Sequence, residues 1–491
     1  MAEVAAGAGI ALAAEQVIST TAQVGTAGYI LTKPTQPLKA KFTRIATADD
    51  EDMNRRSLTR SHHSVTVIDN KAHIFGGTTS SGEIASNDIH IINLRSEKEK
   101  NYHHEPEYQL IPALSSNPSG GSDVPAARTQ HAACAFNSHV AIYGGADASG
   151  SPLEENSSIW LYDPTNKTWS QLSSSTSETV PGPRAGARLF ASSSSSSTTV
   201  EDAKALFLYG GTTQEGRVSS DLWSFDVPTS TWHALPNPPV LASPTNAALV
   251  DGHLYLISSD DAISSSLHIL PVSAASSPAD GTNDTLKDDT DLPKWTTLTF
   301  PTNPLAPGPR ARRDGALVPI TTGYGRNYLV YLLGARETPP PPTGTTPSSS
   351  SSAKRHEDQT PTQWSDTWTL QLPSSSLIQN PFPTSSSSSS HETGTTAAAA
   401  TALTTTIKPA HIKDTLRTSV GASSGTWSWA EVELVVPSDP EEEVKEGKLH
   451  PGPRSSFGAD VLSLERNKVV FWGGVDAKGE VVGDGWVVGF E

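Results

Sequence analysis

The 491 residues carry 35 Lys and Arg against 52 Asp and Glu, a formal net charge of −17. This balance argues against nonspecific binding to nucleic acid, which needs clustered basic side chains. It suits a protein that avoids self-association, so we expect a monomer. A single cysteine, Cys134, excludes an intrachain disulfide and favours the reducing cytoplasm.

The first 35 residues are rich in Ala, Gly and Val. No Lys or Arg precedes Lys33, whereas a signal peptide begins with a positive region. Glu15 and Gln16 interrupt the apolar run, which argues against a membrane span. A stripe at three- and four-residue spacing predicts a helix within residues 1–35 that packs on the following domain, formed by Val17, Thr21, Val24, Gly28 and Leu31.

From residue 36 onward the chain repeats one pattern of four short strands. In the clearest copy, Arg184 precedes an apolar strand, and the next strand ends in Tyr209-Gly210-Gly211. A third strand follows at residues 220–225 and a fourth at residues 231–235. A period of roughly 40–50 residues with four strands is typical of β-propellers. We place six blades at about residues 60–113, 128–175, 184–236, 245–300, 310–435 and 454–490.

Two copies depart from the pattern. In the fourth copy, Ser258 and Ser259 replace the glycine pair, and the sixth copy stops without a fourth strand. Residues 40–46 have the missing pattern, since the aromatic Phe42 is followed by the aliphatic Ile45. Closing the ring with this strand leaves no open sheet edge. We therefore predict that residues 40–46 supply the outer strand of the sixth blade and that residues 36–491 form one all-β domain.

Recurring glycines and aromatic residues have structural reasons. A glycine pair ends the second strand, where a side chain would obstruct the turn and the neighbouring backbone. These pairs are Gly76-Gly77, Gly144-Gly145, Gly210-Gly211 and Gly473-Gly474. Two aromatic rows are predicted to pack between blades, with ligand stacking as the alternative. The rows include Trp160, Trp223, Trp368 and Trp486 in third strands and Trp169, Trp232, Trp295 and Trp429 in fourth strands.

The order of Arg, glycine pair, Asp with an aromatic residue, and Trp with an aliphatic residue resembles the kelch repeat. The resemblance covers residues 40–490 apart from insertions, and it implies a six-bladed kelch propeller while indicating little about activity. Low-complexity insertions interrupt the blades and cannot offset their ordering entropy. We expect mobile surface loops at residues 96–106, 192–202, 274–290, 337–361, 374–424 and 436–449.

Arginine opens five of the six copies: Arg60, Arg128, Arg184, Arg310 and Arg454. Because first strands line the channel of a propeller, these guanidinium groups should converge at one channel mouth. Their planar forks suit carboxylate or phosphate. This predicts an interaction module that binds a protein or an anionic small molecule at the mouth. In the alternative, each arginine pairs with an Asp or a carbonyl group and only fastens the blades together.

No metal or cofactor is expected. His62-His63, His103-His104 and His131 lack the companions that a transition-metal site needs. Two groups of kelch enzymes were compared. Galactose-oxidase-like proteins need a Tyr–Cys cross-link, whereas Cys134 lies in an Ala-rich strand. Nitrile-specifier-like proteins carry Glu-x-x-x-Asp-x-x-x-His, which Glu83–His90 does not match, although the arginines resemble that family's substrate-contacting ones. A small-molecule-processing or metal-assisted enzyme that uses the same mouth stays the alternative function.

Overall fold

The computed structural model describes residues 34–47, 57–94, 106–117, 123–175, 180–192, 203–258, 266–272, 293–300, 308–310, 312–323, 325–336, 363–374, 410, 413–414, 417–418, 421, 423–435 and 449–491. The predicted N-terminal helix and most of the predicted insertions lie outside these residues. Within them, no helix is long and apolar enough to cross a membrane.

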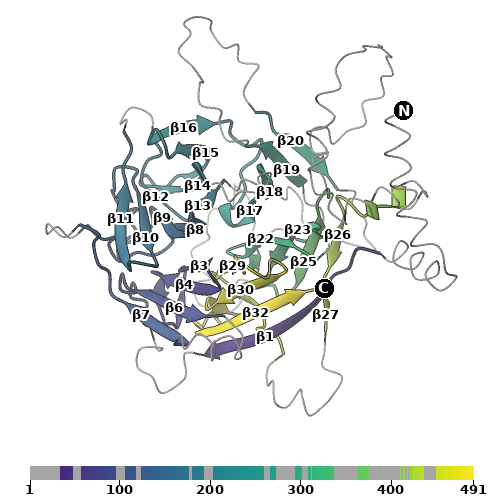
Figure 1. Cartoon of the computed structure of the whole chain (residues 1–491), viewed down its shortest axis with the longest axis horizontal. Helices are drawn as coiled ribbons and strands as arrows, with labels where there is room; N and C mark the ends of the chain where they lie inside the picture. The colour runs from purple at the N-terminus through teal and green to yellow at the C-terminus, as the bar shows by residue number, and fades with distance from the viewer. Residues whose placement is uncertain are drawn as a thin grey trace, which may run out of the picture.

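Six antiparallel sheets stand around a common axis (Figure 1). Blade one contains β3 (Ser64–Ile68), β4 (Lys71–Phe75), β6 (Ile89–Asn93) and β7 (Tyr108–Ile111), and blade two contains β8 (Ala132–Phe136), β9 (His139–Tyr143), β10 (Ile159–Asp163) and β11 (Thr168–Leu172). Blade three contains β13 (Arg188–Ala191), β14 (Ala205–Thr213), β15 (Val218–Asp226) and β16 (Thr231–Leu235), and blade four contains β17 (Ala247–Val250), β18 (His253–Ser258), β19 (Ser266–Pro271) and β20 (Thr296–Thr299). Blade five contains β22 (Ala316–Thr321), β23 (Asn327–Leu332), β25 (Thr367–Gln371) and β26 (Trp429–Glu431). The prediction of a six-bladed all-β propeller is confirmed.

Blade six is closed by the N-terminal strand. Its sheet runs from β29 (Gly458–Val461) through β30 (Lys468–Trp472) and β32 (Asp484–Phe490) to β1 (Lys39–Thr47). β1 is antiparallel to β32, and β27 (Glu433–Leu434) adds a parallel strand on its other side. Phe42 of β1 is buried and lies edge-on to Phe471 at 6.3 Å between ring centroids. The predicted closure at residues 40–46 is confirmed, and the strand extends one residue further at each end.

The segment before β1 lies against blade five. The Tyr328 hydroxyl donates a hydrogen bond to the Thr35 carbonyl at 2.9 Å, and Gln36 Nε2 donates to the Thr369 carbonyl at 3.0 Å. Ser428 Oγ donates to Gln36 Oε1 at 2.8 Å. Because β1 then pairs with β32, the N-terminal segment connects blades five and six.

Part of the predicted loop insertion at residues 374–424 packs against blade five. Arg326, which is only 3% exposed, binds both carboxylate oxygens of Asp414, at 2.5 and 2.9 Å. Ala410 is buried beside this pair and accepts a longer hydrogen bond from Arg326. Our expectation of a mobile loop over residues 374–424 does not hold for these residues, because a buried arginine needs an anionic partner that the insertion supplies.

Aromatic side chains fill the spaces between neighbouring blades. Trp169 of blade two lies 5.3 Å from Phe75 of blade one, between ring centroids. Trp232 of blade three lies 5.7 Å from Tyr143 of blade two. The core is thus a set of apolar layers, each shared by adjacent sheets, and it holds the inner ends of the blades in fixed positions around the axis.

Candidate functional site

Five blades hold a buried arginine four residues before the start of the inner strand. In blade five this residue is Arg312, with 0% exposure, and not Arg310, which is exposed. The prediction of Arg310 was wrong by two residues, because the Pro-Arg pair at residues 309–310 resembles those of other blades. The short strand β21 (Arg312–Arg313) pairs with β24 (Ala335–Arg336), as β2 (Arg60–Ser61) pairs with β5 (Thr78–Thr79) in blade one. The five equivalent arginines are Arg60, Arg128, Arg184, Arg312 and Arg454.

Arg128 shows how such an arginine is held. Its Nη1 donates to the Gly144 carbonyl at 2.9 Å, and its two terminal nitrogens bind the Glu155 carboxylate at 2.8 and 2.5 Å. Its own backbone carbonyl accepts a hydrogen bond from the Gly77 amide of blade one at 2.9 Å. The side chain therefore fixes blade two internally, while the backbone fastens it to the preceding blade.

Three further blades repeat this arrangement with an aspartate that also accepts a hydrogen bond from a tryptophan. In blade three, Arg184 binds Asp221 at 2.6 Å, and Trp223 Nε1 donates to the same carboxylate at 2.6 Å. The equivalent groups are Arg312, Asp366 and Trp368 in blade five and Arg454, Asp484 and Trp486 in blade six. In these four blades a carboxylate of the protein binds the guanidinium group. Three of the four arginines, Arg128, Arg184 and Arg454, are candidates for ligand binding from the sequence.

In blade one, a histidine takes the place of the carboxylate that binds the buried arginine. Arg60 Nη2 lies 2.9 Å from His90 Nε2, and His90 Nδ1 lies 2.8 Å from the Tyr108 hydroxyl. Because arginine only donates, His90 Nε2 accepts and its proton resides on Nδ1. Burial lowers the pKa of His90 to about 3 and that of Arg60 to about 10. The imidazole is thus neutral at physiological pH.

The glycine pairs allow the blades to approach closely. Gly76 has φ +61°, and a Cβ added there would lie 2.5 Å from the Arg128 carbonyl oxygen. Blade four lacks the pair, and there Asn246 Nδ2 donates to the Arg312 carbonyl at 3.0 Å. A side-chain amide thus replaces the backbone amide of the missing glycine. Nothing in the repeat pattern pointed to Asn246.

A chain of backbone hydrogen bonds runs around the mouth. It joins the second residue after each buried arginine, and all five of these residues have positive φ. The bonds run from Ser456 N to Asp314 O at 2.7 Å, from His62 N to Ser456 O at 2.8 Å, from Gln130 N to His62 O at 3.0 Å and from Gly186 N to Gln130 O at 2.7 Å. We call these five residues the mouth belt. Four of them are not glycine, so the left-handed conformation was not foreseen.

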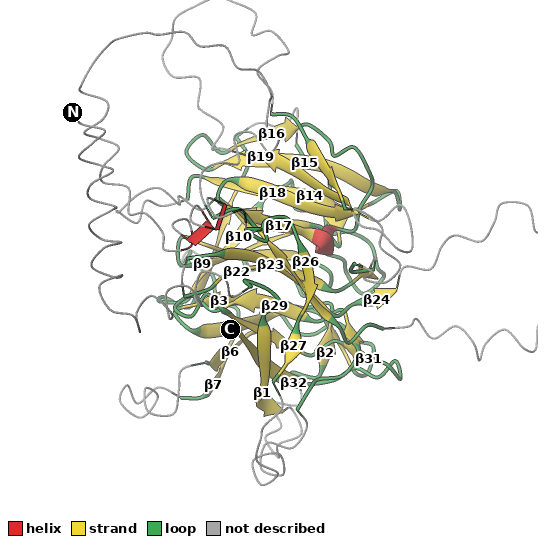
Figure 2. Ribbon diagram, turned by 90° about the vertical axis from the view of Figure 1, so that its right-hand side faces the viewer, coloured by secondary structure: helices red, strands yellow, loops and turns green. Residues whose placement is uncertain are grey.

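Exposed charges around the mouth are unevenly distributed. Blade five presents Arg310, Arg313 and Arg336. The hairpin tips of blades one, three and six carry the exposed Glu83, Glu215 and Glu480, with Arg217 and Lys478 interspersed, and those of blades two and six carry the half-buried Asp147 and Asp476. Arg313 is 48% exposed and 3.8 Å from Asp314, and the Arg310 guanidinium lies 5.3 Å from the Trp364 ring centroid. Figure 2 shows β2, β24 and β31 (Val475–Asp476) on the same side of the ring. The mouth therefore has a basic sector, Arg310, Arg313 and Arg336, on blade five.

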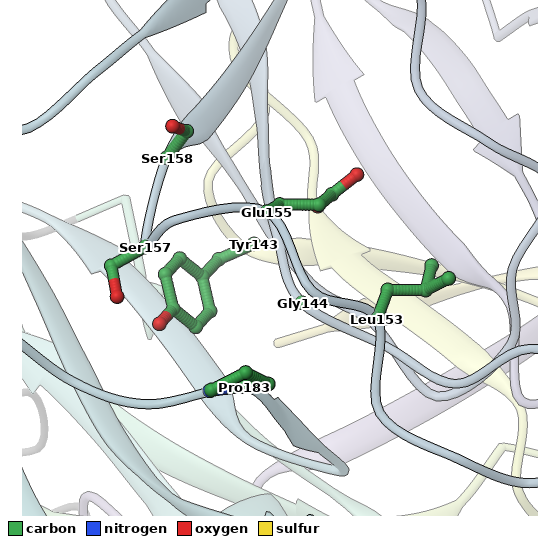
Figure 3. A pocket seen from close by; sticks show the side chains of 7 residues that line it. All are labelled: Tyr143, Gly144, Leu153, Glu155, Ser157, Ser158 and Pro183. Atoms are coloured by element: carbon green, nitrogen blue, oxygen red, sulfur yellow. The ribbon is translucent and has the colours of Figure 1, made fainter.

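A small cavity lies between blades two and three (Figure 3). Its volume is about 10 Å³, roughly the space of one water. In Figure 3 the Tyr143 ring extends between Ser157 and Pro183. A neighbouring depression of about 430 Å³ is lined by Glu154, Asn156, Ser157, Ser174, Ser175, Val180, Gly182 and Pro183. Both have a mixed polar and apolar lining.

The histidines named from sequence take separate places. His131 Nε2 lies 2.8 Å from Ser64 Oγ, and His63 is buried against Gly473. Burial lowers the pKa of both side chains. Across the described ranges, no three His, Cys, Asp or Glu side chains gather as metal ligands would. His103 and His104 fall outside those ranges.

Asp460 of β29 lies at the inner edge of blade six. Its carboxylate accepts hydrogen bonds from the backbone amides of Val67, on the inner strand of blade one, and Val461, both at 2.8 Å. Burial raises the pKa of this carboxyl group to about 6, and the two backbone hydrogen bonds and then the charge of Arg188 oppose the rise. The carboxylate thus connects the two blades that close the ring.

We expect Asp460→Asn to stabilise the protein above pH 6. Because the pKa in the folded protein exceeds the ordinary value of 3.8, folding binds the proton, so wild-type stability falls as pH rises from about 4 to about 6. Asparagine avoids burying the charge, but its amide nitrogen replaces one of the two oxygens that accept from the Val67 and Val461 amides. The lost hydrogen bond offsets part of the benefit, so the expected gain at pH 7.5 is about 1 kcal/mol. Thermal unfolding of both proteins from pH 4 to 8 measures the difference. Curves that stay parallel over this range would contradict the assignment.

Residues 60–196 match the family model described as KLHDC2/KLHL20/DRC7 Kelch-repeats domain. Among solved structures, the chain is similar to that of YjhT, with 12% sequence identity and a TM-score of 0.46, covering 88% of this chain and 97% of the other. The search of curated proteins found no match.

Proposed function

Because the chain is a kelch-repeat β-propeller, we propose that it is an interaction module whose mouth binds an acidic segment of a protein partner. The observation that carries the proposal is the basic sector of blade five. Its three arginines are exposed on a chain whose net charge is −17. Free anionic small molecules of similar chemistry are the alternative ligands for the same sector.

The buried arginines support this proposal indirectly. Their guanidinium groups are engaged by carboxylates, carbonyls or His90, so they form a rigid frame and offer few free donors. A ligand at the mouth would instead contact side chains that project from the frame. Arg310, the one sequence candidate that is exposed, belongs to this second group. Arginine forks outside the frame are suited to bidentate binding of carboxylates.

Charge also indicates which partners are disfavoured. Acidic hairpin tips on the other blades repel a uniformly acidic surface, so the partner should present its negative charge locally, opposite blade five. Such complementarity sets specificity and association rate more than affinity. The interaction should therefore weaken as salt rises, because exposed charges are screened over about 8 Å at physiological ionic strength. We propose that the protein acts as a monomer in the cytoplasm.

The test compares proteins captured by the full chain and by a variant with Arg310→Glu and Arg313→Glu. We expect specific partners of the wild type to be lost, or weakened at least about tenfold, because two attractions become repulsions. The matched control is Arg466→Glu with Lys204→Glu, which makes the same change in charge at exposed residues of the β29–β30 and β13–β14 connections, away from the mouth. Binding to a purified captured partner is then measured by calorimetry at low and high salt.

The proposal fails if the variant with Arg310→Glu and Arg313→Glu binds the partner as well as the wild type and the control variant do. It also fails if the captured partner binds through a basic segment. Loss of the partner together with binding of isolated small carboxylates to blade five would favour the small-molecule alternative. Unfolding curves of both variants must match that of the wild type, which is expected because the replaced side chains are at the surface.

A further inference from the structure

Arg188 is a second kind of arginine in this ring. It begins β13, the inner strand of blade three, and no described residue forms a hydrogen bond or an ion pair with its guanidinium group. Its Nε atom is buried and unpaired, and its guanidinium carbon lies 6.0 Å from the centroid of the Phe190 ring. Buried donors are normally paired with protein, water or an ion. The guanidinium group of Arg188 therefore has no acceptor among the described residues, and its buried Nε is left unpaired.

Arg188 lies beside the axis of the ring, because β13 is the innermost strand of its sheet and pairs only with β14. Asp460 of blade six and Cys134 of blade two both interact electrostatically with it, although they lie on separate sheets. Blades three and six stand across the ring from each other (Figure 1). The Asp460 oxygens already accept hydrogen bonds from Val67 and Val461, so they are directed at backbone amides. The cation and the carboxylate thus share the axial region without forming an ion pair.

We propose that the axis of the propeller contains a site for one small oxyanion, a carboxylate or a phosphate group, held by the guanidinium fork of Arg188. An unpaired arginine that is half-buried, with its Nε out of contact with water, favours a planar bidentate acceptor. Water can solvate it only in part at such a position, so an anion of matching shape gains both charge neutralisation and paired hydrogen bonds. This site uses none of the residues of the basic sector on blade five.

Asp460 is the positioning residue that sets the affinity. Its carboxylate lies near enough to Arg188 and Cys134 to act on their ionisation, so its negative charge also opposes an incoming anion. Protonation or Asp460→Asn removes this repulsion without removing the donor fork. The occupancy of the site should therefore rise as pH falls through about 6, where the pKa of Asp460 lies. Cys134 stays a neutral thiol over this range, because burial raises its pKa.

The experiment titrates sodium formate into the full-length protein at pH 7.5 and pH 5.5, and follows heat and melting temperature. Formate is chosen because it stays a monoanion at both values. We expect saturable binding that tightens about tenfold at the lower pH, with a similar gain for Asp460→Asn at pH 7.5. Arg188→Met should abolish the saturable part. Sodium chloride at equal ionic strength corrects for general salt effects.

Three variants separate the outcomes. Arg188→Lys keeps the charge but not the fork, so it should weaken formate binding and still fold if Arg188→Met does not. Arg310→Glu with Arg313→Glu should leave formate binding unchanged. A negative result for the axial site is therefore distinguishable from a negative result for partner binding at the mouth. An equal response of wild type and the Arg188 variants would overturn the proposal, as would an Asp460→Asn protein with unaltered affinity.

Discussion

A variant without residues 36–48 is expected to lose the folded state of the whole propeller, and not only that of one blade. These residues include β1, which pairs with β32 along its length and buries Leu38, Ala40 and Phe42. Its removal exposes both the apolar layer next to blade five and the edge of β32. Such an edge also invites aggregation. Circular dichroism, thermal unfolding and size-exclusion chromatography of the soluble fraction measure the loss.

A point substitution tests the same closure in a milder form. Phe42→Ala should lower the free energy of unfolding by about 3–5 kcal/mol, because it removes a buried ring packed on Phe471. Thr43→Ala is the matched control, since Thr43 is exposed on the same strand and its loss should cost less than about 1 kcal/mol. A deletion variant that melts like the full-length protein would disprove the closure.

We expect a large difference in stability between alanine variants of two arginines, Arg310 and Arg312, which are two residues apart in the sequence. Arg312→Ala should destabilise the protein by about 3–5 kcal/mol, because it leaves the partly buried Asp366 carboxylate without its cation. It also removes a donor to the Leu333 carbonyl and the contact with the Tyr331 ring at 4.4 Å. Arg310→Ala should cost no more than about 1 kcal/mol, the loss of an exposed contact with Trp364.

Chemical denaturation of the two variants gives the comparison. Equal costs for Arg310→Ala and Arg312→Ala would show that the two side chains do not differ in role. Arg312→Lys is informative as well, because lysine retains the charge but cannot bind Asp366 and the Leu333 carbonyl with a fixed fork. We expect it to recover only part of the lost stability.

Much of the fold was predictable because each blade is specified by a short sequence pattern within its own residues. Hydrophobic runs, turn residues and tryptophans recur with the blade, and an incomplete final copy required a strand from elsewhere in the chain. The position of Arg312 was missed because Pro309-Arg310 has the same sequence as Pro183-Arg184. What fixes the position is the distance to the inner strand, and the start of β22 is not evident from sequence.

The site was less predictable, because its main features depend on contacts between blades. Glu155 replaces the aspartate of other blades from a different place in the sequence, five residues before Trp160. The docking of Asp414 on Arg326 joins segments 88 residues apart. The unpaired state of Arg188 is a property of its surroundings, and its sequence neighbours give no sign of it.

The mouth belt is not a complete circle. In the described part of the chain, its backbone hydrogen bonds join blades five, six, one, two and three, and none of this kind reaches blade four. Blade four instead relies on side-chain atoms such as those of Asn246. A pulling force applied across the ring should therefore separate blade four from its neighbours first. This blade is the part of the ring with the lowest expected mechanical stability.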